Sequence, residues 1–334
     1  MPSVSLGLTR DSIFQEIDLK PHGWIILDKP LELGSTQAVG AVKRNLREAG
    51  LLGKGKSKTK VGHGGTLDPL ATGVLPIAIG EATKLCGRML DATKKYEFTI
   101  KFGSETDTLD VEGKVTENSD HRPTLTEVEG VLPQFTGEIE QIPPKYSALK
   151  IDGKRAYDLA RAGEDVEMKV RGVTVLALSA CSLKRNSGEE KLEEIALRAE
   201  VSKGTYIRSL ARDVACALGT VGHVTMLRRT KAGPFALKHA ISLDKLNEIG
   251  KGADIKDYLL PLEAGLDDIP AFDLTPDQAR MLRQGQVLDA QDLPKEMVRN
   301  PAINGTFLAT EDDSPVALAE LVDGTVKVVR GFNL

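Results

Sequence analysis

Cysteine is scarce in this chain, and long apolar runs are absent. Three cysteines in 334 residues, none spaced as CxxC, predict neither a disulfide framework nor a zinc site. The longest nearly uncharged apolar stretch, residues 74–79, is far shorter than the roughly 20 residues that cross a bilayer, and the N-terminus has no signal-peptide core. The five histidines show no HExxH or other paired spacing. We therefore expect a cytoplasmic protein with no membrane segment and no metal.

Acidic and basic residues nearly balance, with a net charge of −4, but they are unevenly distributed. Residues 256–334 hold 7 basic and 14 acidic side chains, and the first 255 residues hold 37 basic and 34 acidic ones. A mildly basic body is compatible with a polyanionic partner. Acidic C-terminal regions are also common for solubility alone, so both interpretations stay open.

The length predicts two domains, because domains average about 150 residues. We expect an N-terminal arm at residues 1–20, a main domain at 21–262 and a small, mostly β unit at 268–334. Short strands alternate with helices along the main domain; one helix begins at the N-cap candidate Ser35, and Tyr96 belongs to a strand of alternating apolar and polar residues. This mixture predicts an α+β fold around a mixed, largely antiparallel sheet.

One segment matches a phosphate-binding loop. Residues 50–57, GLLGKGKS, satisfy the pattern GxxxxGK[ST]. A true phosphate loop leaves a strand and enters a helix, whose N-terminus binds the anion, whereas here a helix leads in and a glycine-rich stretch follows. We therefore favour a solvated, lysine-rich loop at 54–60 and keep a nucleotidase only as a competing class.

The densest glycine-rich stretch is residues 62–73, GHGGTLDPLATG. Glycines allow positive φ and close approach of a ligand, and Pro69 biases Asp68 away from helical geometry. The apolar neighbours of Asp68 suggest a carboxylate in dry surroundings, which then needs a cationic partner. The alternative is an aspartate that caps a helix or closes a turn.

Six segments in order resemble the bacterial tRNA pseudouridine synthase family of the TruB type. They are GWIILDKP at 23–30, GHGGTLDPLATG at 62–73, KYE at 95–97, IPPKYSA at 142–148, KGTYIRS at 203–209 and HVTMLRR at 223–229. The resemblance covers about residues 22–235, and the C-terminal unit resembles the family's PUA-like RNA-binding module. One departure is the segment 31–35, LELGS, where the family has a small Gly and then Thr or Ser.

The resemblance implies that uridine 55 in the T arm of tRNA is isomerised to pseudouridine after base flipping, without cofactor, nucleotide or metal. It implies that Asp68 is the essential carboxylate, as a nucleophile or as the trigger of a glycal-type intermediate, with Arg208 as its partner. Arg208 could instead bind phosphate.

The resemblance assigns further residues to the substrate. It implies that Tyr96 stacks on the target base and takes part in proton transfer, that Tyr206 and Leu227 line the uracil pocket, and that Lys29 supports the active-site loop. His63 would fill the space that the flipped base leaves. Each residue also has an ordinary structural interpretation, as a core side chain or a turn histidine. We expect a monomer that binds the T-arm stem–loop, and a non-catalytic RNA-binding protein is the other competing class.

Overall fold

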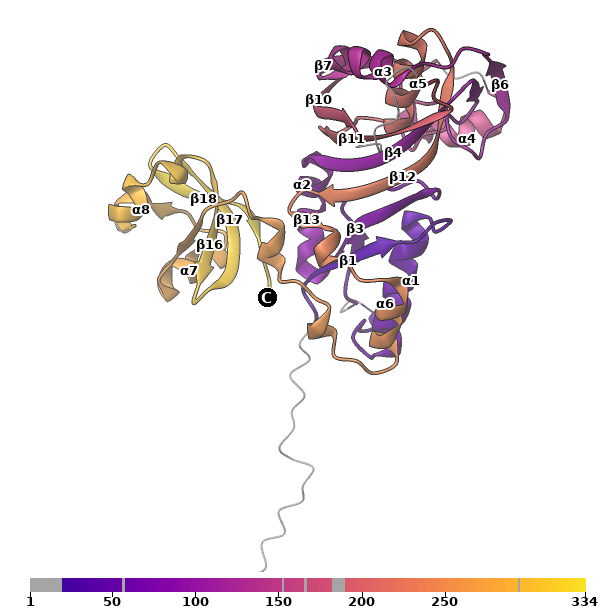
Figure 1. The fold of residues 1–334 in the computed structure, drawn as a ribbon. Helices are drawn as coiled ribbons and strands as arrows, with labels where there is room; N and C mark the ends of the chain where they lie inside the picture. The colour runs from indigo at the N-terminus through magenta and orange to yellow at the C-terminus, as the bar shows by residue number, and fades with distance from the viewer. Residues whose placement is uncertain (1–19, 56–57, 152, 165–166, 182–189, 294) are drawn as a thin grey trace, which may run out of the picture.

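The computed structural model describes residues 20–55, 58–151, 153–164, 167–181, 190–293 and 295–334. A nine-stranded sheet forms the main body of these residues (Figure 1). Its central path is β1 (Gly23–Lys29), β3 (Ala71–Ile79), β12 (Gly222–Ala232), β4 (Lys94–Phe102), β11 (Glu194–Val201), β10 (Arg171–Ala180) and β7 (Gly137–Gln141). Strand β2 (Val61–His63) pairs with β3, and β13 (Phe235–Ala236) pairs with β12. Only β12 and β3 run parallel along this path, which confirms the predicted mixed, largely antiparallel α+β fold.

Helices cover the sheet at both ends (Figure 1). Helices α1 (Ser35–Glu48) and α6 (Leu243–Gly250) lie at the β1 end, and α3 (Leu125–Val131) and α5 (Ile207–Ala217) lie at the β7 end. The smaller elements are α2 (Cys86–Asp91), α4 (Ala156–Arg161), the hairpin β5–β6 (Ser104–Thr106, Val115–Asn118) and the hairpin β8–β9 (Lys150–Ile151, Lys154–Arg155). Among the described residues, no helix has the length and apolar character to span a membrane.

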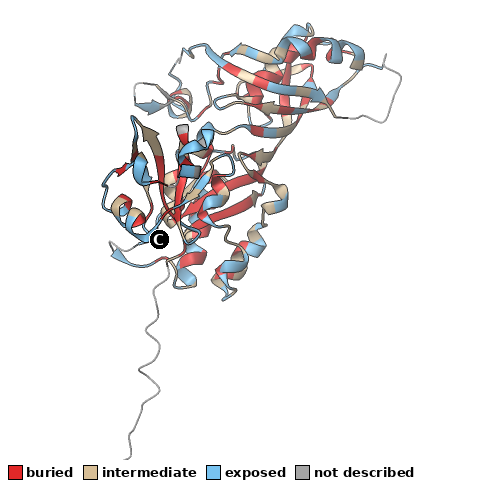
Figure 2. Ribbon diagram, turned by 90° about the vertical axis from the view of Figure 1, so that its left-hand side faces the viewer, coloured by how far each residue is buried: buried red, intermediate tan, exposed pale blue. Residues whose placement is uncertain are grey.

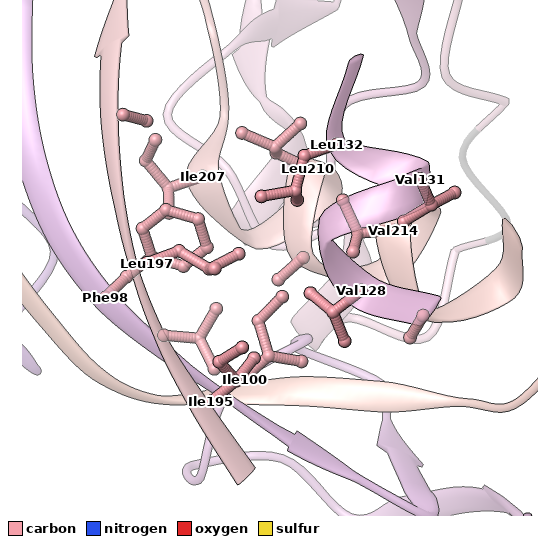
Figure 3. Packing of buried hydrophobic residues seen from close by; sticks show 14 of the residues in the cluster. Phe98, Ile100, Val128, Val131, Leu132, Ile195, Leu197, Ile207, Leu210 and Val214 are labelled. Carbon is pink, nitrogen blue, oxygen red and sulfur yellow. The ribbon is translucent and has the colours of Figure 1, made fainter. Parts of the chain in front are cut away.

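Two apolar clusters lie on one face of the sheet and meet near its middle. Figure 3 shows one of them, in which Phe98 and Leu197 of the sheet pack against Leu210 of α5. The second cluster lies under α1 and α6. Tyr96 and Leu227 are partly buried and pack against both clusters, because β4 and β12 carry every second side chain to this face. A half-covered junction between two cores is a natural place for a ligand.

The C-terminal unit is a separate five-stranded sheet, which Figure 1 shows beside the main body. Its order is β14 (Ala271–Asp273), β16 (Thr306–Glu311), β17 (Ser314–Val322), β18 (Thr325–Gly331) and β15 (Leu288–Asp289). It also contains α7 (Pro276–Arg283) and α8 (Lys295–Arg299), and its five strands make it mostly β, as the sequence predicted. Its residues Leu308 and Phe332 join a third apolar cluster with Trp24 of the main body, and Figure 2 shows buried strands in both units.

The structure corrects the expected cap of α1 and defines the elements on either side of residues 50–57. Ser35 was expected to cap α1, but Gly34 is the N-cap residue, and the hydroxyl of Ser35 instead bonds to Leu67. Helix α1 leads into residues 50–57 and strand β2 follows them, which is the reverse of a phosphate loop's strand-to-helix order. Residues 56 and 57 lie outside the described part of the chain.

Candidate active site

Asp68 lies on the turn that enters β3, at the junction of the two clusters. Its backbone oxygen accepts a hydrogen bond from the N–H of Ala71 at 3.0 Å, so the turn leads directly into the strand. Gly65 and Gly73 on either side have φ of 139° and 101°, which a side chain would strain. The side chain of Asp68 is 40% exposed, so the expected dry surroundings are wrong: the carboxylate faces open cavities.

Arg208 is the cationic partner of Asp68. An Nη of Arg208 lies 2.9 Å from Oδ2 of Asp68, and the arginine side chain is only 7% exposed. The same guanidinium lies 3.4 Å from Oδ2 of Asp110 and donates to the backbone oxygens of Thr108 at 2.8 Å and Tyr146 at 3.0 Å. These contacts hold the guanidinium from several sides, so its position relative to Asp68 is strongly constrained. The structure therefore brings together two residues that are 140 positions apart.

A cavity of about 310 Å³ opens beside this ion pair. Five of the residues predicted from the sequence line it: Asp68, Tyr96, Tyr206, Leu227 and Arg208. Tyr206 is held by its backbone, which exchanges hydrogen bonds with the side chain of Gln141 at 3.1 and 3.4 Å. Burial raises the pKa of the Tyr206 hydroxyl, which therefore stays protonated near neutral pH. The cavity thus joins a flat aromatic lining to a carboxylate at its edge.

Lys29 is bonded to the backbone next to Asp68. Its side chain is fully buried, and its ammonium donates to the backbone oxygens of Pro30, Leu33 and Pro69 at 3.0, 2.6 and 3.1 Å. Burial lowers the pKa of Lys29 to about 8, and the nearby Asp68 charge opposes that shift. Lys29 lies outside the lining of the 310 Å³ cavity, and its position is compatible with the predicted supporting role.

The segment 31–35, where the sequence departs from the family pattern, also holds the Asp68 turn. Glu32 adopts φ of 65°, and its N–H donates to the oxygen of Pro69 at 2.9 Å. The buried hydroxyl of Ser35 accepts from the N–H of Leu67 at 2.8 Å and donates to the oxygen of Leu67 at 2.9 Å. The residue before Asp68 is therefore bound through both its backbone groups.

His63 ends β2 and lies outside the lining of the 310 Å³ cavity. Its Nδ1 accepts a hydrogen bond from the N–H of Gly65 at 3.4 Å, as an ordinary turn histidine would. Burial lowers the pKa of His63, and the charge of Arg229 lowers it further. The ring is therefore neutral at pH 7. Of the lysine-rich segment 54–60, the described residues Lys58 and Lys60 are exposed.

Sequence reasoning missed several charged residues around this site. Arg229 is buried and donates to the backbone oxygens of Val74, Gly65 and Thr66 at 2.7, 3.1 and 3.2 Å. Lys94, rather than the neighbouring Lys95, is buried at the cavity wall. The alternation of β4 places Lys94 on the same face as Tyr96, and this pattern could have identified it.

Two further ion pairs join motifs that the sequence had treated separately. Arg228 forms a bidentate pair with Asp28 at 3.0 and 2.8 Å, which ties the end of β1 to β12. Asp110, the second carboxylate on Arg208, is 11% exposed and accepts a hydrogen bond from the hydroxyl of Thr108 at 2.6 Å. Among the described residues, no group of three or more His, Cys, Asp or Glu side chains could hold a metal ion.

Comparison with known proteins gives consistent matches over most of the chain. The family model described as TruB family pseudouridylate synthase, N-terminal domain, matches residues 54–207, and the model described as tRNA pseudouridylate synthase B C-terminal domain matches residues 208–267. The chain is 63% identical over 312 residues to tRNA pseudouridine synthase B of Novosphingobium aromaticivorans, which covers 93% of this chain and 97% of the relative. It is 54% identical over 312 residues to the protein of the same name in Zymomonas mobilis, with coverage of 93% and 96%.

Solved structures show the same fold at lower identity. One is a chain of an H/ACA RNP bound to a substrate RNA containing 2′-deoxyuridine, with a TM-score of 0.67, 22% identity and coverage of 93% of this chain and 85% of that one. Another belongs to an archaeal box H/ACA sRNP Nop10–Cbf5 complex, with a TM-score of 0.64, 23% identity and coverage of 95% and 89%. The main body therefore has the pseudouridine synthase fold.

Proposed function

Because this chain belongs to the TruB family of pseudouridylate synthases, we propose that it isomerises uridine 55 in the T arm of tRNA to pseudouridine. The observation that carries the proposal is the Asp68–Arg208 pair at the edge of a cavity of about 310 Å³ lined by two tyrosines. The reaction breaks the N1–C1′ bond and joins C5 to C1′, so substrate and product have the same composition. It therefore needs no cofactor.

Asp68 is the reacting group of this proposal. Its carboxylate either attacks C1′ of the flipped nucleotide or removes the 2′ proton, and both routes require it to be ionised. Arg208 places an opposite charge 2.9 Å from Oδ2 of that carboxylate. The open cavities around Asp68 leave its other oxygen accessible to the sugar.

The remaining predicted residues take roles around the base. Tyr96 stacks on the uracil ring, Tyr206 and Leu227 close the pocket, and Lys29 holds the turn that carries Asp68. Their support is the cavity lining and the three hydrogen bonds from Lys29 to backbone oxygens. His63 fills the space that the base leaves in the T loop; its exit from the Gly65 contact at 3.4 Å would cost little, because that bond is long.

The partner is tRNA, bound through its T-arm stem–loop, in the cytoplasm where tRNA is used. We propose a monomeric enzyme. We also propose that the C-terminal unit, residues 268–334, extends the RNA contact as a PUA-like module. The second family model ends at residue 267, and the second sheet begins at Ala271, which supports this division.

The test is conversion of an unmodified T-arm stem–loop by the full chain without added metal or nucleotide. Wild type should form carbodiimide-reactive pseudouridine at one site. Asp68→Asn should abolish the product while RNA affinity measured by filter binding stays close to wild type. The matched control is Asp107→Asn, because Asp107 lies in the neighbouring cavity and its Oδ1 accepts the backbone N–H of Lys114 at 2.9 Å, a bond that an amide oxygen can also accept.

Two results would contradict the proposal. Product formation that persists in Asp68→Asn would remove the role of that carboxylate. Tight RNA binding by wild type with no product at any uridine would instead indicate an RNA-binding protein without this activity.

A further inference from the structure

The cavity beside Asp68 is lined by more positive than negative charge. Its charged side chains are one carboxylate, Asp68, and three cations, Lys94, Arg208 and Arg229. Arg208 is already paired with Asp68 at 2.9 Å and with Asp110 at 3.4 Å. The charges of Lys94 and Arg229 therefore remain without a formal counter-charge in the cavity wall.

Both remaining cations are held by backbone oxygens. The ammonium of Lys94 donates to the oxygens of Leu90 and Ala92 at 2.6 Å each, and the guanidinium of Arg229 donates to three carbonyl groups of the Asp68 turn and β3. Within the part of the chain that the structure describes, neither has a carboxylate at ion-pair distance. Burial of a cation without a counter-ion is unfavourable, so such an arrangement favours a ligand that supplies negative charge.

The strand register places these cations around the ring that would stack on the base. Arg229 of β12 pairs directly with Tyr96 of β4, and Lys94 lies two residues before Tyr96 on the same face of its strand. Burial lowers the pKa of Lys94 to about 8, and Arg229 contributes to the shift. Lys94 is therefore still protonated in most molecules at pH 7.

The bound base is neutral before reaction, and its charge changes during it. When the N1–C1′ bond breaks, its electron pair passes to the uracil ring and spreads over N1 and the two carbonyl oxygens. The sugar is then held either as an ester of Asp68 or as a glycal whose 2′ proton Asp68 has taken. C5 then attacks C1′, either as the ester oxygen of Asp68 leaves C1′ with its electron pair or as Asp68 returns the 2′ proton to the glycal. C5 afterwards loses a proton and N1 gains one.

We propose that Lys94 and Arg229 form a cationic wall that stabilises the negative charge developing on the detached uracil. The inference rests on the proposed function and deepens it. Fixed charges that are oriented before the reaction stabilise such an intermediate without having to reorganise. They would contribute little to binding of the neutral base, so their effect falls on the chemical step.

The first experiment separates this role from RNA binding and from folding. Lys94→Met removes the charge at similar length, Lys94→Arg keeps it, and Lys95→Met is the matched control, because Lys95 is exposed and bound to Glu200 at 3.0 Å. We expect Lys94→Met to lower the single-turnover rate on the T-arm stem–loop by about 10- to 100-fold, with the RNA dissociation constant within about twofold of wild type. Lys94→Arg should recover most of the rate, and Lys95→Met should match wild type.

Opposite outcomes are equally clear. An unchanged rate in Lys94→Met would refute the proposed role of the cationic wall. A loss of activity that appears mainly as weaker, more salt-sensitive RNA binding would also refute it, because it would indicate a phosphate contact. Activity of wild type on the same RNA separates these results from failure of the proposed function. Each variant is assayed below its own unfolding midpoint, because Lys94 also binds the last carbonyls of α2.

A second measurement uses only the wild-type protein and so does not depend on a variant that folds. Barbiturate has the size of uracil and carries one negative charge at pH 7, whereas uracil is neutral. As competitors of the stem–loop reaction, barbiturate should inhibit at about a tenfold lower concentration than uracil if the wall selects negative charge. Equal inhibition, or stronger inhibition by uracil, would refute the proposal.

Discussion

Ser35 offers a direct test of how the Asp68 turn is held. Its buried hydroxyl accepts from the N–H of Leu67 at 2.8 Å and donates to the oxygen of Leu67 at 2.9 Å, one residue before Asp68. Ser35→Ala removes both bonds and leaves a buried N–H without a partner. The free energy of unfolding should fall by about 1–3 kcal/mol, the usual cost of one unsatisfied buried polar group.

If Asp68 acts as proposed, the activity should fall as well, because the lost bonds position the turn that carries it. A displacement of a reacting group by about 1 Å can cost a hundredfold in rate, and a smaller shift of Asp68 should cost about tenfold or more. The assay is the single-turnover rate on the T-arm stem–loop, measured with urea unfolding of the same preparation.

Ser242→Ala is the matched control, because it should lower the stability of the fold without moving the Asp68 turn. Ser242 caps α6, where its hydroxyl accepts from the N–H of Lys245 at 3.2 Å, and loss of such a cap costs about 1 kcal/mol. We expect a similar loss of stability and a wild-type rate. If both variants lose activity to the same extent, or if Ser35→Ala keeps the full rate, the positioning role of Ser35 is refuted.

Three further predictions follow from buried charges and glycines. Arg208→Met should lower the free energy of unfolding, measured in urea, by about 3–5 kcal/mol, because it leaves Asp110, which is 11% exposed, without its cation. The double variant Arg208→Met, Asp110→Asn should recover part of that loss. No recovery would argue against the ion pair. Burial lowers the pKa of Lys29 from 10.5 to about 8, so the folded protein binds fewer protons than the unfolded chain between these pH values. The free energy of unfolding should therefore rise with pH across that window. The rise should be smaller in Lys29→Met. Gly73→Ala should destabilise the fold by more than about 2 kcal/mol, because φ is 101° and the added Cβ would lie 2.2 Å from a backbone oxygen of β12. Gly40→Ala on α1, where the added Cβ meets open space, should stabilise the fold by about 0.5–1 kcal/mol. Calorimetry that gives the two changes the same sign would contradict this prediction.

Much of the fold could be predicted from local patterns. The alternation around Tyr96 indicated its strand correctly, because side chains on a strand repeat every two residues. The helix expected at Ser35 is α1, but its N-cap residue is Gly34. Ser35 looks like a cap from its neighbours alone, and only the distant Leu67 shows why its hydroxyl is used otherwise.

The site was less accessible to local reasoning. Nothing in the spacing of Asp68 and Arg208 places them in contact, and the pairing was expected only from the family resemblance. Lys94 and Arg229 were missed because a lysine or arginine on a strand is usually a solvated side chain. Their burial depends on the pairing of β4 with β12, which is a property of the sheet and not of either segment.

The parallel strand β12 carries three side chains with different tasks at consecutive positions. Leu227 lines the 310 Å³ cavity, Arg228 binds Asp28, and Arg229 binds the backbone of the glycine-rich turn. A slip of one residue would exchange the two sides of the strand, and all three tasks would fail at once. Interruptions of the regular pairing with β4, between Val224 and Met226 and between Arg229 and Lys231, make a slipped alignment hard to accommodate. Molecules in which β12 has a shifted register should therefore be inactive and readily degraded by proteases. A cell would then hold few partly active molecules of this enzyme.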